Sequence, residues 1–188
     1  MRAEIRRQGR VPAVLFAPGE IDKKIISVCQ KEMSALVRKH SLSGVQCEVF
    51  NLEVSSAIGD GDVEQPIKVQ AIPKQVIMHV TDKSVTNVCF MTVKPETTVR
   101  VRIPVVTQGD DVCPGSKKGG FIHVIRREIA VTTRSDNIPK LFLMDVSMLD
   151  IGQVMKISDI QVPQGVRISE PNISLPIIRV GGKTRGAA

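Results

Sequence analysis

The feature that most constrains this chain is a hydrophobic pattern that repeats every two residues. In TVRVRIPVV, at 98–106, apolar residues fall on one face of an extended strand while Arg100 and Arg102 fall on the other. VQCEVFNLEV, at 45–54, alternates in the same way and predicts another strand. Further apolar runs predict strands at 11–17, 23–28, 66–72, 85–93, 122–131, 141–146 and 175–180. The abundance of Val and Ile over Ala agrees with a mainly β fold.

One segment has helical rather than strand periodicity. In QKEMSALVRKH, at 30–40, Met33, Leu36 and Val37 recur at helical spacing, with charged residues between them. The segment Ser41–Gly44 then predicts the end of the helix. A stripe of this kind is typical of a packed core, so we expect one clear helix in an otherwise β-rich region.

The chain is long enough for two domains. We expect a small RNA-binding β-barrel with the one helix at 1–93, a second β-rich domain at 94–182, and a disordered tail at 183–188. Aromatic residues make up only 3% of the chain, with no Trp and no Tyr, so Val, Ile, Leu and Met must build the core. This composition argues against functions that need a platform of stacking rings, such as general single-strand binding.

The charge of the chain is strongly positive and unevenly placed. The net charge is +7, and the pI is near 9.5. Residues 1–40 hold nine Lys or Arg against four Asp or Glu, residues 41–92 hold three against six, and residues 93–188 hold fourteen against nine. Such placement indicates an anionic partner, with RNA ahead of DNA or a membrane surface, over a basic protein that is merely soluble.

No catalytic or metal-binding pattern is present in the sequence. Its three histidines are isolated, its four cysteines form no CxxC pair, and no GxSxG occurs. GDGD at 59–62 predicts a turn but lacks the later ligands of a calcium loop. GSKKGG at 115–120 lacks the spacing of a phosphate loop, so Lys117 and Lys118 indicate either an RNA or protein contact or a plain basic loop. We expect no enzyme activity, metal, cofactor or small-molecule substrate.

No secretory signal or apolar run of membrane-spanning length is found, so no membrane partner is expected. The basic first ten residues could instead be the remnant of an organellar leader. These residues hold Arg2, Arg6, Arg7 and Arg10 directly before the first strand. They are either a solvated leader or a set of guanidinium groups that bind phosphates. A short connection to a rigid strand favours phosphate binding, because it holds the guanidinium groups near one place.

Four long motifs resemble a family of large-subunit ribosomal proteins that bind 5S rRNA, whose two-domain members include the general stress protein Ctc. They are RRQGRVPAVLFAPG, VTNVCFMTVKPETTVRVRIPVV, PGSKKGGFIHVIRREIAV and IPKLFLMDVSMLDIGQVMKISDIQVPQGVRI, which together cover most of the chain. The resemblance implies a first domain that is a small barrel similar to the anticodon-binding barrels of glutaminyl-tRNA synthetase and sits on 5S rRNA. It implies a β-rich second domain that faces other parts of the ribosome.

The resemblance carries over Arg6, Arg7, Arg10 and Phe16 as RNA-binding residues, with Arg2 nearby. Where the family commonly has Gln-Arg-His-Pro, this chain has Gln70-Ala71-Ile72-Pro73-Lys74, so Gln70 and Lys74 become candidates. Where the family commonly has His-x-Asp-Phe, it has Asn87-Val88-Cys89-Phe90. Asn87 can still form hydrogen bonds, but Cys89 cannot replace a carboxylate, so we expect a reduced or altered RNA contact.

The expected function is therefore that of a structural constituent of the large ribosomal subunit. Its expected partners are 5S rRNA, large-subunit rRNA and neighbouring ribosomal proteins. The drift of the motifs favours a mitochondrial ribosome, with the plastid and the bacterial cytoplasm as alternatives. Two other functions remain open: a tRNA-binding accessory domain that works with a synthetase, and a protein–protein adaptor or stress protein whose RNA contacts have lapsed.

Overall fold

The computed structural model describes residues 2–19, 22–55 and 66–182, with side chains from Glu4 onward. Its contacts divide the chain into two compact units, Met1–Val101 with Thr133–Ile138 and Arg102–Thr132 with Pro139–Ala188. Strands account for far more of the described residues than helices, which confirms the mainly β prediction. The domain boundary after residue 93 remains a prediction. The turn at 59–62 and the tail at 183–188 lie outside the described residues.

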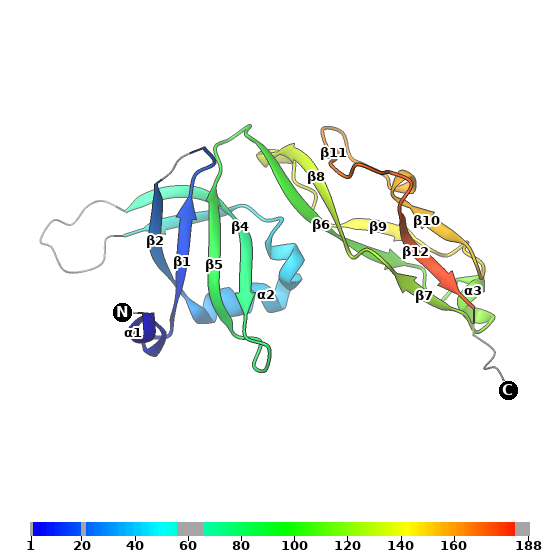
Figure 1. The fold of residues 1–188 in the computed structure, drawn as a ribbon, viewed down its shortest axis with the longest axis horizontal. Helices are drawn as coiled ribbons and strands as arrows, with labels where there is room; N and C mark the ends of the chain where they lie inside the picture. The colour runs from blue at the N-terminus through cyan, green and yellow to red at the C-terminus, as the bar shows by residue number, and fades with distance from the viewer. Residues whose placement is uncertain (1, 20–21, 56–65, 183–188) are drawn as a thin grey trace, which may run out of the picture. The chain divides into compact units, whose positions relative to one another are not determined.

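The first unit is built on one five-stranded sheet (Figure 1). Its strands are β1 (Arg10–Phe16), β2 (Lys23–Cys29), β3 (Phe50–Val54), β4 (Ile67–Met78) and β5 (Val85–Thr92). Their order is β2-β1-β5-β4-β3, with β1 parallel to β5 and the other neighbours antiparallel. The sheet curls into a half-barrel, in agreement with the small barrel expected for this part of the chain.

The core of the first unit lies between this sheet and α2 (Gln30–Val45), which crosses one face of the sheet (Figure 1). Every second residue of β1 is buried there, as the period-two pattern predicts. The helix contributes Met33, with Leu36 and Val37 packed beside it. The buried cluster comprises Val11, Ala13, Leu15, Met33, Ala71, Val76, Val85, Val88 and Phe90.

The helix predicted at 30–40 is confirmed, and its predicted end is a kink. Ser41 has φ 62° and ψ 168°, which interrupts the helical backbone, and the helix then continues to Val45. The Ser41 hydroxyl accepts a hydrogen bond from the Gly44 N–H at 3.3 Å. The strand predicted from 45 to 54 is wrong over its first half, because the chain turns there and β3 begins only at Phe50.

The described residues form two further sheets and one short helix, mostly within the second unit. A four-stranded sheet, in the order β11-β8-β6-β9, consists of β6 (Thr98–Gln108), β8 (Glu128–Arg134), β9 (Phe142–Asp145) and β11 (Arg167–Ile168). The second of these two sheets, in the order β10-β12-β7, consists of β7 (Phe121–Val124), β10 (Val154–Lys156) and β12 (Pro176–Gly181). The helix is α3 (Pro114–Lys117), and η2 (Ile157–Asp159) is a single 3-10 turn of the same unit. The other 3-10 turn, η1 (Ser135–Asn137), belongs to the first unit.

The single strand predicted at 122–131 is wrong, because the chain changes sheets there. The N–H groups of Ile125 and Arg126 donate to the carbonyl oxygen of Ile177, while the carbonyl of Arg127 accepts from Val105. The segment therefore leaves β7 in one sheet and enters β8 in the other. No helix in the described part of the chain is both long and apolar enough to cross a membrane.

Phe90 is the largest fully buried side chain of the first unit's core, at 1% exposure. We expect Phe90→Ala to lower the free energy of unfolding of this unit by about 3–5 kcal/mol, because it removes buried apolar surface and leaves a cavity. Denaturant unfolding followed by NMR signals of the first unit measures this. Ile25→Ala, at a site that is 83% exposed, should change stability by less than about 0.5 kcal/mol, and equal effects of the two changes would contradict the assigned core.

Candidate nucleic-acid interface

The arginine-rich opening of the chain is a short helix attached to the sheet. Helix α1 (Arg2–Arg7) carries Arg6 and Arg7 in its last turn, and both side chains are exposed. The structure records no bonding partner for either guanidinium among the described residues. Of Arg2, only the backbone position in this helix is described.

The connection from this helix to β1 is held by backbone hydrogen bonds. Gly9, at φ 69°, makes the turn in the left-handed region that favours glycine. Its N–H donates to the carbonyl of Arg6 at 3.0 Å, and its carbonyl accepts from Gln30, the first residue of α2, at 3.0 Å. The opening segment is therefore fastened to the rest of the unit, which distinguishes it from a free, solvated leader.

Arg10 is the first residue of β1 and is held against β2. Its Nε donates to Ser27 Oγ at 2.9 Å and its Nη2 to the Ser27 carbonyl at 2.8 Å. The guanidinium has more N–H donors than these two bonds use, and the side chain is exposed. Its position is therefore fixed while donors remain for an anion. Ser27 was not among the candidates from the sequence, although it lies in the strand predicted at 23–28.

The strand register places three predicted residues on one face of the sheet. Arg10 and Phe16 alternate with the buried residues of β1, so they lie on the face opposite α2. On β5, Val88 is buried and Asn87 is half-buried on the opposite face. We define this face as the outer face of the first sheet. The Oδ1 of Asn87 is buried and has no hydrogen-bond partner.

The two candidates on β4 differ in their surroundings. Gln70 is exposed and lies opposite Asn51, at a shallow hollow lined also by Lys68 and Glu53. The ammonium of Lys68 forms an ion pair with Glu53 at 3.1 Å. Lys74 lies at a bulge of β4, and its ammonium donates to the carbonyl of Arg100. The structure therefore gives Lys74 a role in holding the backbone, whereas the amide of Gln70 lies at an open surface.

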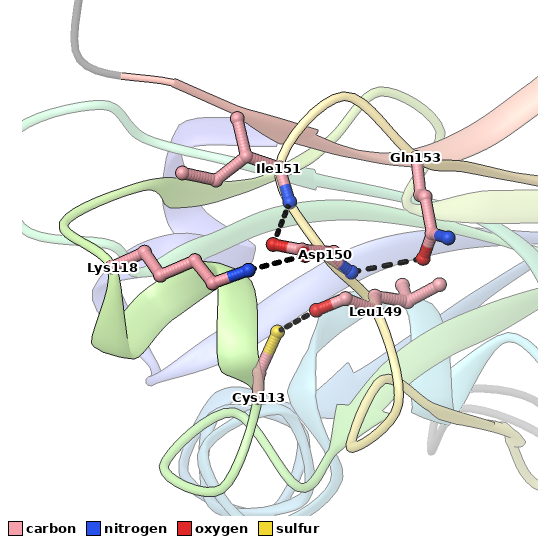
Figure 2. Close-up of polar contacts among 6 residues, drawn as sticks. All are labelled: Cys113, Lys118, Leu149, Asp150, Ile151 and Gln153. Carbon is pink, nitrogen blue, oxygen red and sulfur yellow. Dashed lines mark hydrogen bonds and ion pairs between the residues drawn. The ribbon is translucent and has the colours of Figure 1, made fainter.

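The remaining candidates, Lys117 and Lys118, lie in the second unit, at the end of α3. Figure 2 shows that the ammonium of Lys118 points at Asp150, with which it forms an ion pair. The same carboxylate accepts from the N–H of Ile151 at 2.7 Å. These two contacts hold the pKa of Asp150 below its ordinary value. The ammonium of Lys118 is therefore already bonded within the fold. Lys117 is exposed, and the structure records no partner for its side chain among the described residues.

Gly115 and Gly120, on either side of these lysines, are required by close packing rather than by phosphate binding, whereas Gly119 has no neighbour within 4 Å of an added Cβ. A Cβ at Gly115 would lie 2.6 Å from Val180 Cγ1, and one at Gly120 would lie 2.7 Å from the Gly115 carbonyl oxygen. The Cys113 thiol donates to the Leu149 carbonyl at 3.0 Å (Figure 2). The loop is thus fixed against its neighbours. Within the described ranges, no group of three or more His, Cys, Asp and Glu side chains could hold a metal ion.

Two family models match the chain, one for each half. Residues 2–90 match the model described as the Ribosomal L25p family. Residues 98–183 match the model described as Ribosomal protein TL5, C-terminal domain. The two matches follow one another along the chain in the order expected from the sequence motifs.

Curated relatives named "Large ribosomal subunit protein bL25" are similar over most of the chain. The Rhodospirillum rubrum protein is 32% identical over 163 residues, which are 86% of this chain and 71% of that protein. The Bartonella bacilliformis protein is 31% identical over 180 residues, 93% of this chain and 80% of that protein. The Pelagibacter ubique protein is 26% identical over 162 residues, 86% of this chain and 65% of that protein. The chain thus spans from just under two thirds to four fifths of the length of these three relatives.

Replacing Lys118 tests whether this lysine serves the fold. The hydrogen bond from Lys118 is the main reason that the pKa of Asp150 is lowered, so Lys118→Ala should raise this pKa toward its ordinary value. A lowered pKa stabilises the fold above the ordinary pKa of Asp, and this stabilisation is lost as the pH falls through the lowered value. The variant should therefore be less stable at neutral pH, and this difference should disappear in acid.

Carboxyl ¹³C NMR titration of Asp150 measures the shift directly. Lys117→Ala removes a neighbouring charge without the hydrogen bond and should leave the titration of Asp150 nearly unchanged. An identical pKa in the parent and in Lys118→Ala would contradict the assigned role.

Proposed function

Because the chain belongs to the bL25 family of large ribosomal subunit proteins, we propose that its first unit binds 5S rRNA through α1 and the outer face of the first sheet. The protein is a structural, non-enzymatic constituent of the large ribosomal subunit. The observation that carries the RNA proposal is that the arginine-rich opening segment is held to the rest of the first unit by hydrogen bonds. Arg6 and Arg7 are exposed on a helix whose exit is bonded to α2, and Arg10 is held by Ser27.

Fixed arginines suit a phosphate backbone. The planar guanidinium presents several N–H donors that match phosphate oxygens, and holding it in place beforehand reduces the entropy lost on binding. Each neutralised phosphate also releases counterions, which makes the affinity depend on salt. Structured RNA is read largely through its shape and backbone, so a rigid sheet with basic groups at one end is a suitable partner for it.

The outer face of the first sheet supplies polar contacts beyond the arginines. We assign the amide of Gln70, and the NH2 group of Asn87 rather than its buried Oδ1, to hydrogen bonds with the sugar or base edges of the RNA, and Phe16 to an apolar contact. Cys89 is half-buried on β5 and offers no carboxylate. The RNA contact on this strand is therefore smaller than the family resemblance, with its common His-x-Asp-Phe, implies.

The mechanism is scaffolding. The first unit neutralises phosphates where RNA segments approach one another, and the second unit contacts large-subunit rRNA and neighbouring ribosomal proteins. The match of residues 98–183 to a ribosomal family model supports this division of roles over a tRNA-binding accessory domain. The relatives described above are named as large ribosomal subunit proteins, which supports a ribosomal location. They come from bacteria and so give no support to a mitochondrial ribosome, which stays a prediction.

A titration of labelled 5S rRNA at several salt concentrations tests the proposal. We expect Arg6→Ala/Arg7→Ala/Arg10→Ala to weaken binding and to reduce the slope of log K against log salt by about one to three, because up to three phosphate contacts are lost.

A matched variant separates local contacts from total charge. Lys31→Ala/Arg38→Ala/Lys39→Ala removes the same charge from exposed positions on α2, which covers the opposite face of the sheet. Its salt slope should stay close to that of the parent. Equal slopes for both triple variants would mean that the opening arginines act only through net charge.

A further inference from the structure

The second sheet of the second unit exposes an aromatic ring. Phe121, at the start of β7, is 57% exposed. All five phenylalanines of the chain lie in described residues, and the other four are buried or half-buried. The exposed ring offers a flat apolar face that a partner can cover.

The strand register surrounds this ring with polar and apolar neighbours, one of which is an arginine. Phe121 lies opposite Gly181 of β12, and His123 lies opposite Arg179, which in turn lies opposite Val154 of β10. Residues that pair directly, or that lie two apart on one strand, share a face of the sheet. We define the Phe121 patch as Phe121, His123, Val154, Arg179 and Gly181.

Gly181 makes room for the ring. A Cβ at this position would lie 2.7 Å from the ring atom Cζ and about as close to both Cε atoms. The far end of the ring therefore lies directly over the backbone of β12. Because any larger residue at Gly181 would displace the ring, this glycine sets the position in which Phe121 is presented.

Arg179 supplies the positive charge of the patch. Both Arg179 and His123 are exposed, and the structure records no bonding partner for either side chain among the described residues. None of the five patch residues is an Asp or Glu. An aromatic surface next to a guanidinium, with no carboxylate among the five patch residues, fits a ligand that combines a flat ring with a negative charge.

We propose that the Phe121 patch is a second RNA contact, in which one unstacked base lies on the Phe121 ring and the adjoining phosphate binds Arg179. Bases of single-stranded segments stack on aromatic side chains, and this contact tolerates different base sequences. A protein partner would favour a broader apolar surface than one phenyl ring and one valine side chain. The patch lies in the second unit and is separate from the 5S rRNA surface proposed for the first.

The composition limits the size of this contact. The patch contains one Phe and no Tyr or Trp, so we assign one base to its phenyl ring and not a run of bases. The contact therefore adds to binding within a larger RNA assembly, where one base in a loop or bulge is already unpaired.

The experiment measures binding of short oligouridylate RNA to the full chain. It is done in the Arg6→Ala/Arg7→Ala/Arg10→Ala background, so that the opening arginines do not bind the probe. We expect Phe121→Ala to weaken binding by about 5- to 100-fold, as for loss of one base–aromatic stack. Phe121→Trp should retain binding, and Gly181→Ala should weaken it because the ring is displaced. An oligomer of the same length without bases should bind as weakly to the parent as oligouridylate does to Phe121→Ala.

Leu143→Ala is the matched control, because Leu143 is 58% exposed on β9 of the other sheet. NMR of each variant verifies that the fold is kept, and ring signals of Phe121 and His123 should shift on addition of the RNA. The proposal is overturned if Phe121→Ala binds like the parent, if the abasic oligomer binds equally well, or if these signals move only with ribosomal proteins. None of these outcomes depends on the titration of 5S rRNA, so the two proposals fail separately.

Discussion

The pairing of β1 with β2 on one side and with β5 on the other is the constraint on which the first unit depends. This register buries Val11, Ala13 and Leu15 against α2, and it places Arg10 and Phe16 on the opposite face. A shift of one residue would exchange the two sets, exposing the core and burying a guanidinium. The hydrophobic core and the candidate RNA surface therefore result from the same hydrogen-bond pattern.

The basic residues of the chain have different roles because their neighbours differ. Lys118 and Lys74 each have a bonding partner inside the fold, a carboxylate in one case and a backbone carbonyl in the other. Arg6 and Arg7 are exposed at the end of a short helix. Arg10 combines both situations, since Ser27 orients it without using all of its donors. Net charge alone therefore overstates how much positive charge is available to an RNA.

Much of the fold could be predicted because burial on one side of a strand leaves a two-residue period in the sequence. Strand β6 lies close to where this period placed it, and β1, β2, β5 and β12 lie close to the apolar runs that predicted them. The errors arose where long-range contacts override local pattern. Val45 and Cys47 are buried through a helix end and a turn, although they alternate as in a strand. The segment 122–131 reads as one strand, but its middle bonds to residues of two different sheets. Helix α1 escaped prediction because six residues carry too little periodicity.

The sequence by itself determined the β-rich class, the single long helix, the position of the basic opening and, through its motifs, the family. These properties depend on local periodicity and on the order of residues along the chain. Only the tertiary structure decided which charged side chains have bonding partners inside the fold and which side chains share a face of a sheet. The pairing of Phe121 with Gly181 and of His123 with Arg179 joins residues more than fifty positions apart, and no local pattern records such a contact. The physical reason is that strand register is set by hydrogen bonds and packing between distant segments, which the linear pattern does not contain.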